Sequence, residues 1–237
     1  MRVGAHSDLL HSEVRLVMVA QQFLTMVLLW AFPSHAQRIP VTELSRLELR
    51  NTQAEVTIYR GRRALKLTEK PTGSGKLLAI LPTHPFRDGT IDIDLAGKRS
   101  ATAAESDRGF IGIAFRMQPD EAQYECIYIR PTNGRAQDQL RRNHSTEYES
   151  LPDWPWHRLR KENPGVYESY ADMVEGEWIH MKIVVHGTMA ALYLGGSAQP
   201  CLLINGLKLG DTEGAIALWG GSGTVGYFAN LTIFHGE

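Results

Sequence analysis

The sequence predicts an all-β protein, a two-sheet antiparallel jelly-roll sandwich. Short runs of alternating apolar and polar residues recur along the chain, turn signals separate them, and no helical period lasts over a dozen residues. The turn signals include Asp88-Gly89, Asn205-Gly206 and Gly220-Gly221-Ser222-Gly223. A single short helix is expected near 136–142. The expected strands lie near 47–49, 54–59, 64–68, 77–81, 90–95, 109–117, 123–130, 178–186, 190–194, 202–204, 215–219 and 225–234.

The N-terminal segment predicts an exported protein. Residues 16–32, LVMVAQQFLTMVLLWAF, form an apolar run preceded by Arg15, and Ser34-His35-Ala36 then fits a signal-peptidase site. We expect cleavage after Ala36, which makes 1–36 a signal peptide and 37–237 a single domain in the periplasm or outside the cell. An uncleaved anchor is the alternative. Because the run is at the short end for a membrane span, we expect no stable span after cleavage.

Composition narrows the function classes. The chain carries 25 Lys and Arg against 26 Asp and Glu, a formal charge of −1, so a general nucleic-acid binder is not expected. Cys126 and Cys201 are either bridged, which an exported chain permits, or two buried thiols. No cofactor is expected. A single structural Ca²⁺ stays open as an alternative, because carbonyl ligands leave no trace in a sequence.

The most informative stretch is 109–130, GFIGIAFRMQPDEAQYECIYIR, which predicts two strands joined by a turn at 118–121. Because successive side chains in a strand point to opposite faces, each strand has one apolar face. On the first strand this face comprises Ile111, Ile113, Phe115 and Met117, and on the second it comprises Ile127 and Ile129. The other face combines small residues with Arg116, Tyr124, Tyr128 and Arg130. Space beside rings and a guanidinium suits a planar polar or sugar-like ligand, whereas an ordinary solvated sheet face is the alternative.

The segment 131–176 is interpreted as a long insertion, because its strand alternation is not clear. Loops of this length are usually functional or disordered, and this one is rich in Trp and Tyr, which disfavours disorder. Aromatic rings can stack on sugars, and Arg, Asn and His supply donors for hydroxyls or carboxylates. The alternative is a loop whose rings form a private mini-core. The candidate ligand-binding residues are Arg116, Tyr124, Tyr128, Arg130, Asn133, Arg142, Asn143, His144, Tyr148, Trp154, Trp156 and Arg160.

Two further strands complete the hypothesis of one groove. The polar face of 178–186 carries His180, Lys182 and His186, and one face of 215–219 carries Trp219. If these faces align with Tyr124 and Tyr128, one sheet offers a wet, aromatic groove that the long segment could wall.

Several motifs together resemble the concanavalin A-like lectin/glucanase superfamily. In chain order they are Asp88-Gly89-Thr90-Ile91-Asp92-Ile93-Asp94, 109–116, Gly176-Glu177-Trp178, Gly214-Ala215-Ile216-Ala217-Leu218-Trp219 and Tyr227-Phe228-Ala229-Asn230-Leu231. The resemblance covers roughly 47–234 and looks closest to the laminin-G-like and 3-keto-disaccharide-hydrolase-like domains of exported bacterial proteins. It implies a jelly roll with a concave face that commonly meets carbohydrate, and it is weakly specific for activity.

No catalytic residue can be assigned. Family 16 glucanases of this superfamily carry a Glu-x-Asp-x-x-Glu strand, and the nearest match here is Asp92-x-Asp94, with no glutamate at either end. Glu125, Glu147, Glu149 and Glu168 could supply carboxylates, but no spacing selects a pair. No metal-ligand or nucleophile motif is recognised. We therefore expect an exported carbohydrate-binding protein with a saccharide or polysaccharide partner. A saccharide hydrolase or lyase, and an exported structural or adhesion module, are the alternatives.

Overall fold

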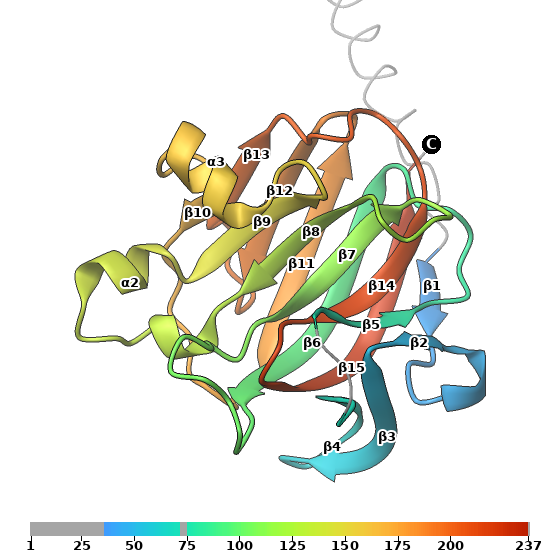
Figure 1. Ribbon diagram of the computed structural model, residues 1–237. Helices are drawn as coiled ribbons and strands as arrows, with labels where there is room; N and C mark the ends of the chain where they lie inside the picture. Colours follow the sequence, from blue (N-terminus) through green and yellow to red (C-terminus); the bar gives the residue numbers. More distant parts are fainter. Residues whose placement is uncertain (1–35, 72–74, 237) are drawn as a thin grey trace, which may run out of the picture. The chain divides into compact units, whose positions relative to one another are not determined.

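The computed structural model describes residues 36–71 and 75–236, which form two packed antiparallel sheets (Figure 1). The eight-stranded sheet has the order β13-β12-β11-β6-β15-β4-β3, and β1 also pairs with β15. The seven-stranded sheet has the order β10-β9-β8-β7-β14-β5-β2. The predicted all-β sandwich is therefore confirmed. The predicted leader lies outside the described residues, apart from Ala36, the first residue of β1.

The elements have the following bounds. The eight-stranded sheet comprises β1 (Ala36–Ile39), β3 (Thr52–Tyr59), β4 (Arg62–Glu69), β6 (Gly89–Arg99), β11 (Ile179–His186), β12 (Met189–Leu194), β13 (Leu202–Asn205) and β15 (Thr224–His235). The seven-stranded sheet comprises β2 (Glu48–Arg50), β5 (Leu77–Ile80), β7 (Ile111–Met117), β8 (Tyr124–Ile129), β9 (Thr146–Leu151), β10 (Glu168–Ser169) and β14 (Ala215–Gly220). The helical segments are η1 (Leu44–Arg46), η2 (Pro131–Asn133), α2 (Gln139–Asn143) and α3 (Trp156–Glu162).

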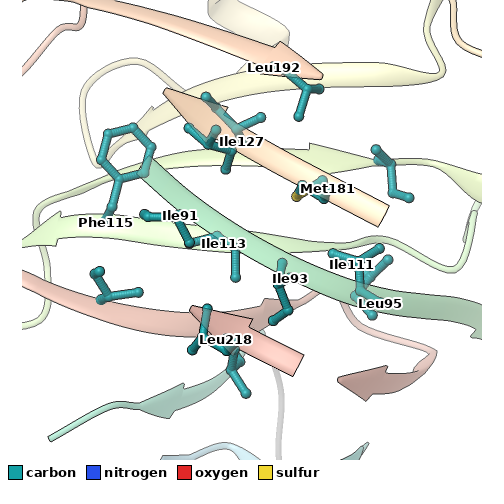
Figure 2. Packing of buried hydrophobic residues seen from close by; sticks show 14 of the residues in the cluster. Ile91, Ile93, Leu95, Ile111, Ile113, Phe115, Ile127, Met181, Leu192 and Leu218 are labelled. Atoms are coloured by element: carbon teal, nitrogen blue, oxygen red, sulfur yellow. The ribbon is translucent and has the colours of Figure 1, made fainter. Parts of the chain in front are cut away.

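The core lies between the two sheets. Alternate residues of β6 and β7, among them Ile91, Ile93, Ile111 and Ile113, point into this layer and are fully buried (Figure 2). Each such side chain contributes roughly 1.5–3 kcal/mol by leaving water. The inward faces predicted for 111–115 and for Ile127 and Ile129 are confirmed. This layer fixes which side chains of the seven-stranded sheet point outward.

A β-bulge in β7 overturns one prediction. The pairing with β14 shifts between Ala215 and Ala217, and Arg116 takes a φ of 52°. The extra residue reverses the alternation, so Met117 joins the outward cluster of this sheet instead of the core. Arg116 is likewise displaced from the outward face on which the sequence pattern placed it.

The segment 131–176 is not an insertion free of strands. Its middle part, β9, pairs with β8 over its full length, from Tyr124 opposite Leu151 to Ile129 opposite Thr146. Its last part supplies β10, and α3 covers the turn between them. The predicted helix near 136–142 appears as the shorter α2, whose N-cap Asp138 accepts hydrogen bonds from the amides of Leu140 and Arg141.

Strand β11 lies in the eight-stranded sheet. The predicted alignment of His180, Lys182 and His186 with Tyr124 and Tyr128 is therefore wrong, since the two sets belong to different sheets. Trp219 does share a sheet with Tyr128. Of the two alternatives for the cysteines, the structure has free thiols: Cys126 is buried and Cys201 is partly buried.

Candidate functional site

The outward face of the seven-stranded sheet carries an apolar, aromatic cluster. Tyr128 of β8 and Trp219 of β14 both pair with Gly112 of β7, which lies between them. Their rings stack with centroids 4.7 Å apart. The cluster comprises Leu78, Ala114, Met117, Tyr124, Cys126, Tyr128, Ala217 and Trp219. Because these side chains are nearly all buried, this cluster forms a floor rather than an open groove.

A buried guanidinium stands at one end of this floor. Arg130, which directly follows β8, is 6% exposed and pairs with the Glu147 carboxylate at 2.5 Å. Its guanidinium carbon lies 5.6 Å from the Tyr128 ring centroid, 5.7 Å from Phe110 and 5.2 Å from Trp156. Cation–π contacts of this kind and the ion pair hold Arg130 in one position.

Helix α3 brings a second arginine to the same carboxylates. Trp156 and Arg160 are one turn apart, so they share a face of the helix, and the Arg160 guanidinium lies 4.8 Å from the Trp156 ring centroid. Arg160 pairs with Glu147 at 2.9 Å and with Glu168 of β10 at 2.6 Å. Trp156 is 36% exposed. We call Tyr128, Arg130, Glu147, Trp156 and Arg160 the β8–α3 platform.

Burial governs the titration of the platform. It raises the pKa of Glu147 to about 8, because the loss of hydration outweighs the opposing attraction of Arg130 and Arg160. His144 lies 2.6 Å from Glu168, from Nδ1 to Oε2. Burial lowers the pKa of His144, and the positive charge of Arg160 lowers it further. Near neutral pH this imidazole is therefore neutral, and Glu147 is able to hold a proton.

Beside the platform lies an open cleft of about 650 Å³. We call it the α2–α3 cleft; it is lined by Leu140, Asn143, His144, Arg160, Pro164, Gly165, Glu168, Ser169 and Tyr170. Arg142 donates to the Tyr170 hydroxyl at 2.9 Å, and its guanidinium lies 5.0 Å from that ring centroid. Tyr170 is 39% exposed. The cleft combines apolar surface with an amide, an imidazole and a guanidinium, which is the usual composition of a small-molecule site.

The structure thus brings together most of the predicted ligand-binding residues. Tyr124 and Tyr128 lie on the floor, while Arg130, Trp156 and Arg160 belong to the platform. Arg142, Asn143 and His144 lie in or beside the cleft.

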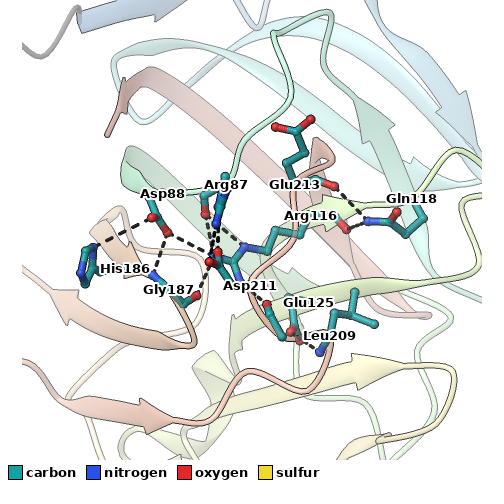
Figure 3. A network of polar contacts seen from close by, with 11 residues as sticks. Arg87, Asp88, Arg116, Gln118, Glu125, His186, Gly187, Leu209, Asp211 and Glu213 are labelled. Carbon is teal, nitrogen blue, oxygen red and sulfur yellow. Dashed lines mark hydrogen bonds and ion pairs between the residues drawn. The ribbon is translucent and has the colours of Figure 1, made fainter. Parts of the chain in front are cut away.

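Arg116 is not part of this site. Its side chain is fully buried and donates to the carbonyl oxygens of Arg87, Gly187 and Gly210 (Figure 3). It also pairs with Asp88 at 3.2 Å. The bulge in β7 redirects the Arg116 side chain, and its contacts then hold three loops together. The role of Arg116 is therefore structural.

Three other predicted residues also serve the fold. Tyr148 points into the inter-sheet core, where its hydroxyl donates to Glu125 at 2.6 Å. Trp154 packs against that core with Arg158 on its ring. Asn133 is buried and donates to the carbonyl oxygen of His144 at 3.0 Å, which positions the start of β9.

The sequence pattern did not select Phe110, Leu140 or Tyr170 as site residues. It offered Glu147 and Glu168 as possible carboxylates without selecting them. One signal was present in 146–150, TEYES, where Glu147 and Glu149 alternate with Tyr148. Such alternation is typical of a strand with one polar face. Among the described residues, no group of three or more His, Cys, Asp or Glu side chains is placed to hold a metal ion. Within the same part of the chain, no helix is long and apolar enough to span a membrane.

Solved structures provide the comparisons for this fold. No protein-family model matches the chain, and no curated protein matches it significantly. The carbohydrate-binding module CBM66 from Bacillus subtilis aligns with 14% identity and a TM-score of 0.53, over 78% of this chain and 93% of that one.

Two further structures align comparably. A Bacillus subtilis protein of unknown function with a galectin-like fold has 11% identity and a TM-score of 0.52, over 84% of this chain and 94% of that one. The exoplasmic/lumenal domain of VIP36, in a Ca²⁺/Man3GlcNAc-bound form, has 10% identity and a TM-score of 0.52, over 87% and 90%. At such identities the likeness concerns the fold alone: the chain shares its two-sheet jelly-roll sandwich with these structures.

Proposed function

We propose that the protein binds a saccharide on the β8–α3 platform and in the α2–α3 cleft beside it. One observation carries the proposal. Trp156 is 36% exposed, although the two arginines on its ring, Arg130 and Arg160, are held by ion pairs with the buried Glu147 and Glu168. An open indole beside fixed hydrogen-bonding groups suits a sugar, which has apolar C–H faces and a rim of hydroxyls.

The cleft extends this surface. Tyr170 offers a second exposed ring, and Asn143 and Arg160 offer an amide and a partly exposed guanidinium. Because Asn143 lies on α2, which contacts η2, and Arg160 lies on α3, which packs against β9, little ordering is needed when a ligand binds. The carbohydrate-binding module CBM66 and the Ca²⁺/Man3GlcNAc-bound VIP36 domain, which share this fold, are consistent with the proposal. We also propose that the chain is related to the laminin-G-like and 3-keto-disaccharide-hydrolase-like domains.

The proposal includes export of the chain after cleavage of 1–36. N-terminal sequencing of the protein recovered from the periplasm or medium is expected to begin at Gln37. Loss of Ala36 would remove only the first pair of the β1–β15 ladder, Ala36 with Phe234. A mature fraction that begins at Met1 would rule out the leader.

A second function, hydrolysis or lysis of a saccharide, has one observation in its favour. The pKa of Glu147, raised to about 8 by burial, allows this carboxyl to keep a proton near neutral pH, as a general acid must. However, Glu147 is 1% exposed, and Arg130 and Arg160 both occupy its Oε2. A substrate would therefore have little access to this carboxyl group, so binding without chemistry is the better-supported function.

A glycan array with the purified domain, followed by calorimetric titration of the best glycan, tests the proposal. Trp156→Ala is expected to weaken binding at least tenfold, as loss of an aromatic hot spot does, with a nearly unchanged melting temperature. Tyr193→Ala is the matched control, because Tyr193 is a partly buried tyrosine on β12 of the other sheet, where Lys182 contacts its ring. Normal binding by Trp156→Ala would refute the site.

Two further results decide between the alternatives. Failure of every glycan to bind would favour a structural or adhesion module. Release of reducing sugar by the wild type, abolished in Glu147→Gln, would instead establish the hydrolase.

A further inference from the structure

Three arginines from different segments surround the short helix η2. Arg108 precedes β7, Arg130 follows β8, and Arg141 lies in α2. The backbone of η2 joins the first two, because the Thr132 amide donates to the Arg108 carbonyl at 3.4 Å and the Asn133 amide donates to the Arg130 carbonyl at 2.8 Å. The Arg141 side chain reaches the Asn133 amide oxygen at 3.4 Å.

The positive charge of this cluster is poorly compensated. Over the described residues, neither Arg108 nor Arg141 forms an ion pair with a carboxylate; Arg108 donates to the carbonyl oxygens of Glu105 and Asp107 instead. Arg130 has Glu147, but shares it with Arg160. The pKa of Arg108 is lowered, first by burial and then by the charges of Arg141, Arg130 and Arg99. Like charges that act on one another in this way destabilise a site unless an anion joins them.

Several hydrogen-bonding groups in the cluster are also unused. The Nε atoms of Arg130 and Arg141 and the hydroxyl of Thr132 are buried, and none has a partner within the described part of the chain. Arg130 as a whole is 94% buried. Buried donors are nearly always paired in native proteins, so an unpaired set of this kind indicates an acceptor that the protein itself does not supply.

We propose that Arg108, Arg130 and Arg141 bind an anionic oxo group, the carboxylate or sulfate of an acidic saccharide. Guanidinium groups match both anions with paired, charge-assisted hydrogen bonds. The inference rests on the proposed function, because Arg130 also belongs to the β8–α3 platform and its guanidinium lies 5.2 Å from the Trp156 ring. A sugar that contacts Trp156 would thus place an acidic substituent beside Arg130. The cluster therefore indicates that the ligand of the proposed site is an acidic saccharide.

The anion site is tested first without any sugar. Melting temperatures are compared in sodium sulfate and sodium chloride at equal ionic strength for the wild type, Arg108→Gln, Arg141→Gln and the control Arg46→Gln. Arg46 is an exposed arginine on η1, and within the described part of the chain its one ion pair is with Glu43. Sulfate is expected to raise the melting temperatures of the wild type and of Arg46→Gln by the same amount. It should raise those of Arg108→Gln and Arg141→Gln by less. An equal rise in all four would show only a general salting effect and would overturn the site.

Acidic and neutral sugars provide the second test. Titrations use oligogalacturonate for the carboxylate, a sulfated heparin oligosaccharide for the sulfate, and a neutral galactan oligosaccharide. We expect one acidic ligand to bind at least tenfold more tightly than the neutral one, and Arg141→Gln to remove that advantage while Arg46→Gln retains it. The acidic ligand that depends on Arg141 identifies the anion.

The two proposals fail in different ways. If neutral and acidic sugars bind equally and Arg141→Gln changes neither, the anion site is wrong and the saccharide site stands. If acidic sugars bind but Arg46→Gln weakens them as much as Arg141→Gln does, the attraction is general charge and the anion site is again wrong. If no sugar binds while sulfate still protects through Arg108 and Arg141, the anion site stands without the saccharide.

Discussion

The rings of Tyr128 and Trp219 stack at 27° across an intervening strand, with centroids 4.7 Å apart. Strand β7 separates their strands, and the residue that pairs with both is Gly112. A Cβ on Gly112 would lie 2.6 Å from the Cβ of Tyr128 and 2.3 Å from the Ile127 carbonyl oxygen. The absence of a side chain at this one position allows two rings from non-neighbouring strands to meet and form the floor below the platform.

Gly112→Ala is therefore expected to break the ring pair. Overpacking at such a contact costs about 1–3 kcal/mol of unfolding free energy, measured by urea denaturation, and the near-ultraviolet circular dichroism of the stacked rings should fall. Gly196→Ala is the control, because Gly196 has a φ of 76° with open space around it. That variant should lose about 1 kcal/mol through backbone strain alone and keep the aromatic signal. An unchanged spectrum for Gly112→Ala would contradict this role of the glycine.

Arg116 and Arg87, which both contact the Asp88–Asp211 network, should contribute very differently to the free energy of unfolding. Arg116→Met leaves three loop carbonyls without their donor in a fully buried place, and removal of one partner of a buried charged network costs about 3–5 kcal/mol. Arg87→Met removes an ion pair with Asp211 at the surface, which is worth about 0–1 kcal/mol. Both should bind ligand normally once folded. Similar free energies of unfolding for the two variants would show that Arg116 does not lock the loops.

The reactivity of the Cys201 thiol should continue to rise with pH well beyond the pH range in which an ordinary thiol ionises. Burial raises the pKa of Cys201 from 9.0 to about 11, so at pH 8 roughly one thiol in a thousand is ionised instead of about one in ten. In a Cys126→Ser variant, the iodoacetamide rate at Cys201 should increase about tenfold per pH unit up to about pH 11. Burial also raises the pKa of the Cys126 thiol well above its usual value, so labelling of the native wild type should show no second, Cys126-dependent phase. Rapid labelling of both thiols at pH 8 would contradict the described burial.

The fold was readable from the sequence because apolar alternation in the core strands is strong. Every predicted strand corresponds to an observed one, from β2 to β15. Strand β9 was missed because its outward residues Glu147 and Glu149 are carboxylates, and Thr146 and Ser150 dilute its inward face. These glutamates are buried only because Arg130, Arg160 and Lys76 come from other segments to pair with them. A strand whose polarity depends on distant partners cannot be identified from local alternation.

The candidate site was partly readable for a related reason. Tyr128, Arg130 and Trp156 were selected by residue type, and the structure places them together. Arg116 and Tyr148 have the same residue types but point elsewhere. Arg116 is redirected by the bulge in β7, and Tyr148 lies on strand β9 opposite the inward-facing Ile127. Side-chain direction depends on strand register, which long-range pairing sets.

The most direct measurement is a nitrogen-15 NMR titration of the tryptophan indoles with the glycan that an array selects. We expect the Trp156 indole signal to shift progressively with ligand concentration. The signal of Trp178, whose Nε1 donates to the Tyr59 carbonyl oxygen on the other sheet, should stay fixed. Assignment by Trp156→Phe and Trp178→Phe makes the readout specific. A shift of Trp178 with no shift of Trp156 would place binding on the opposite sheet and contradict the account.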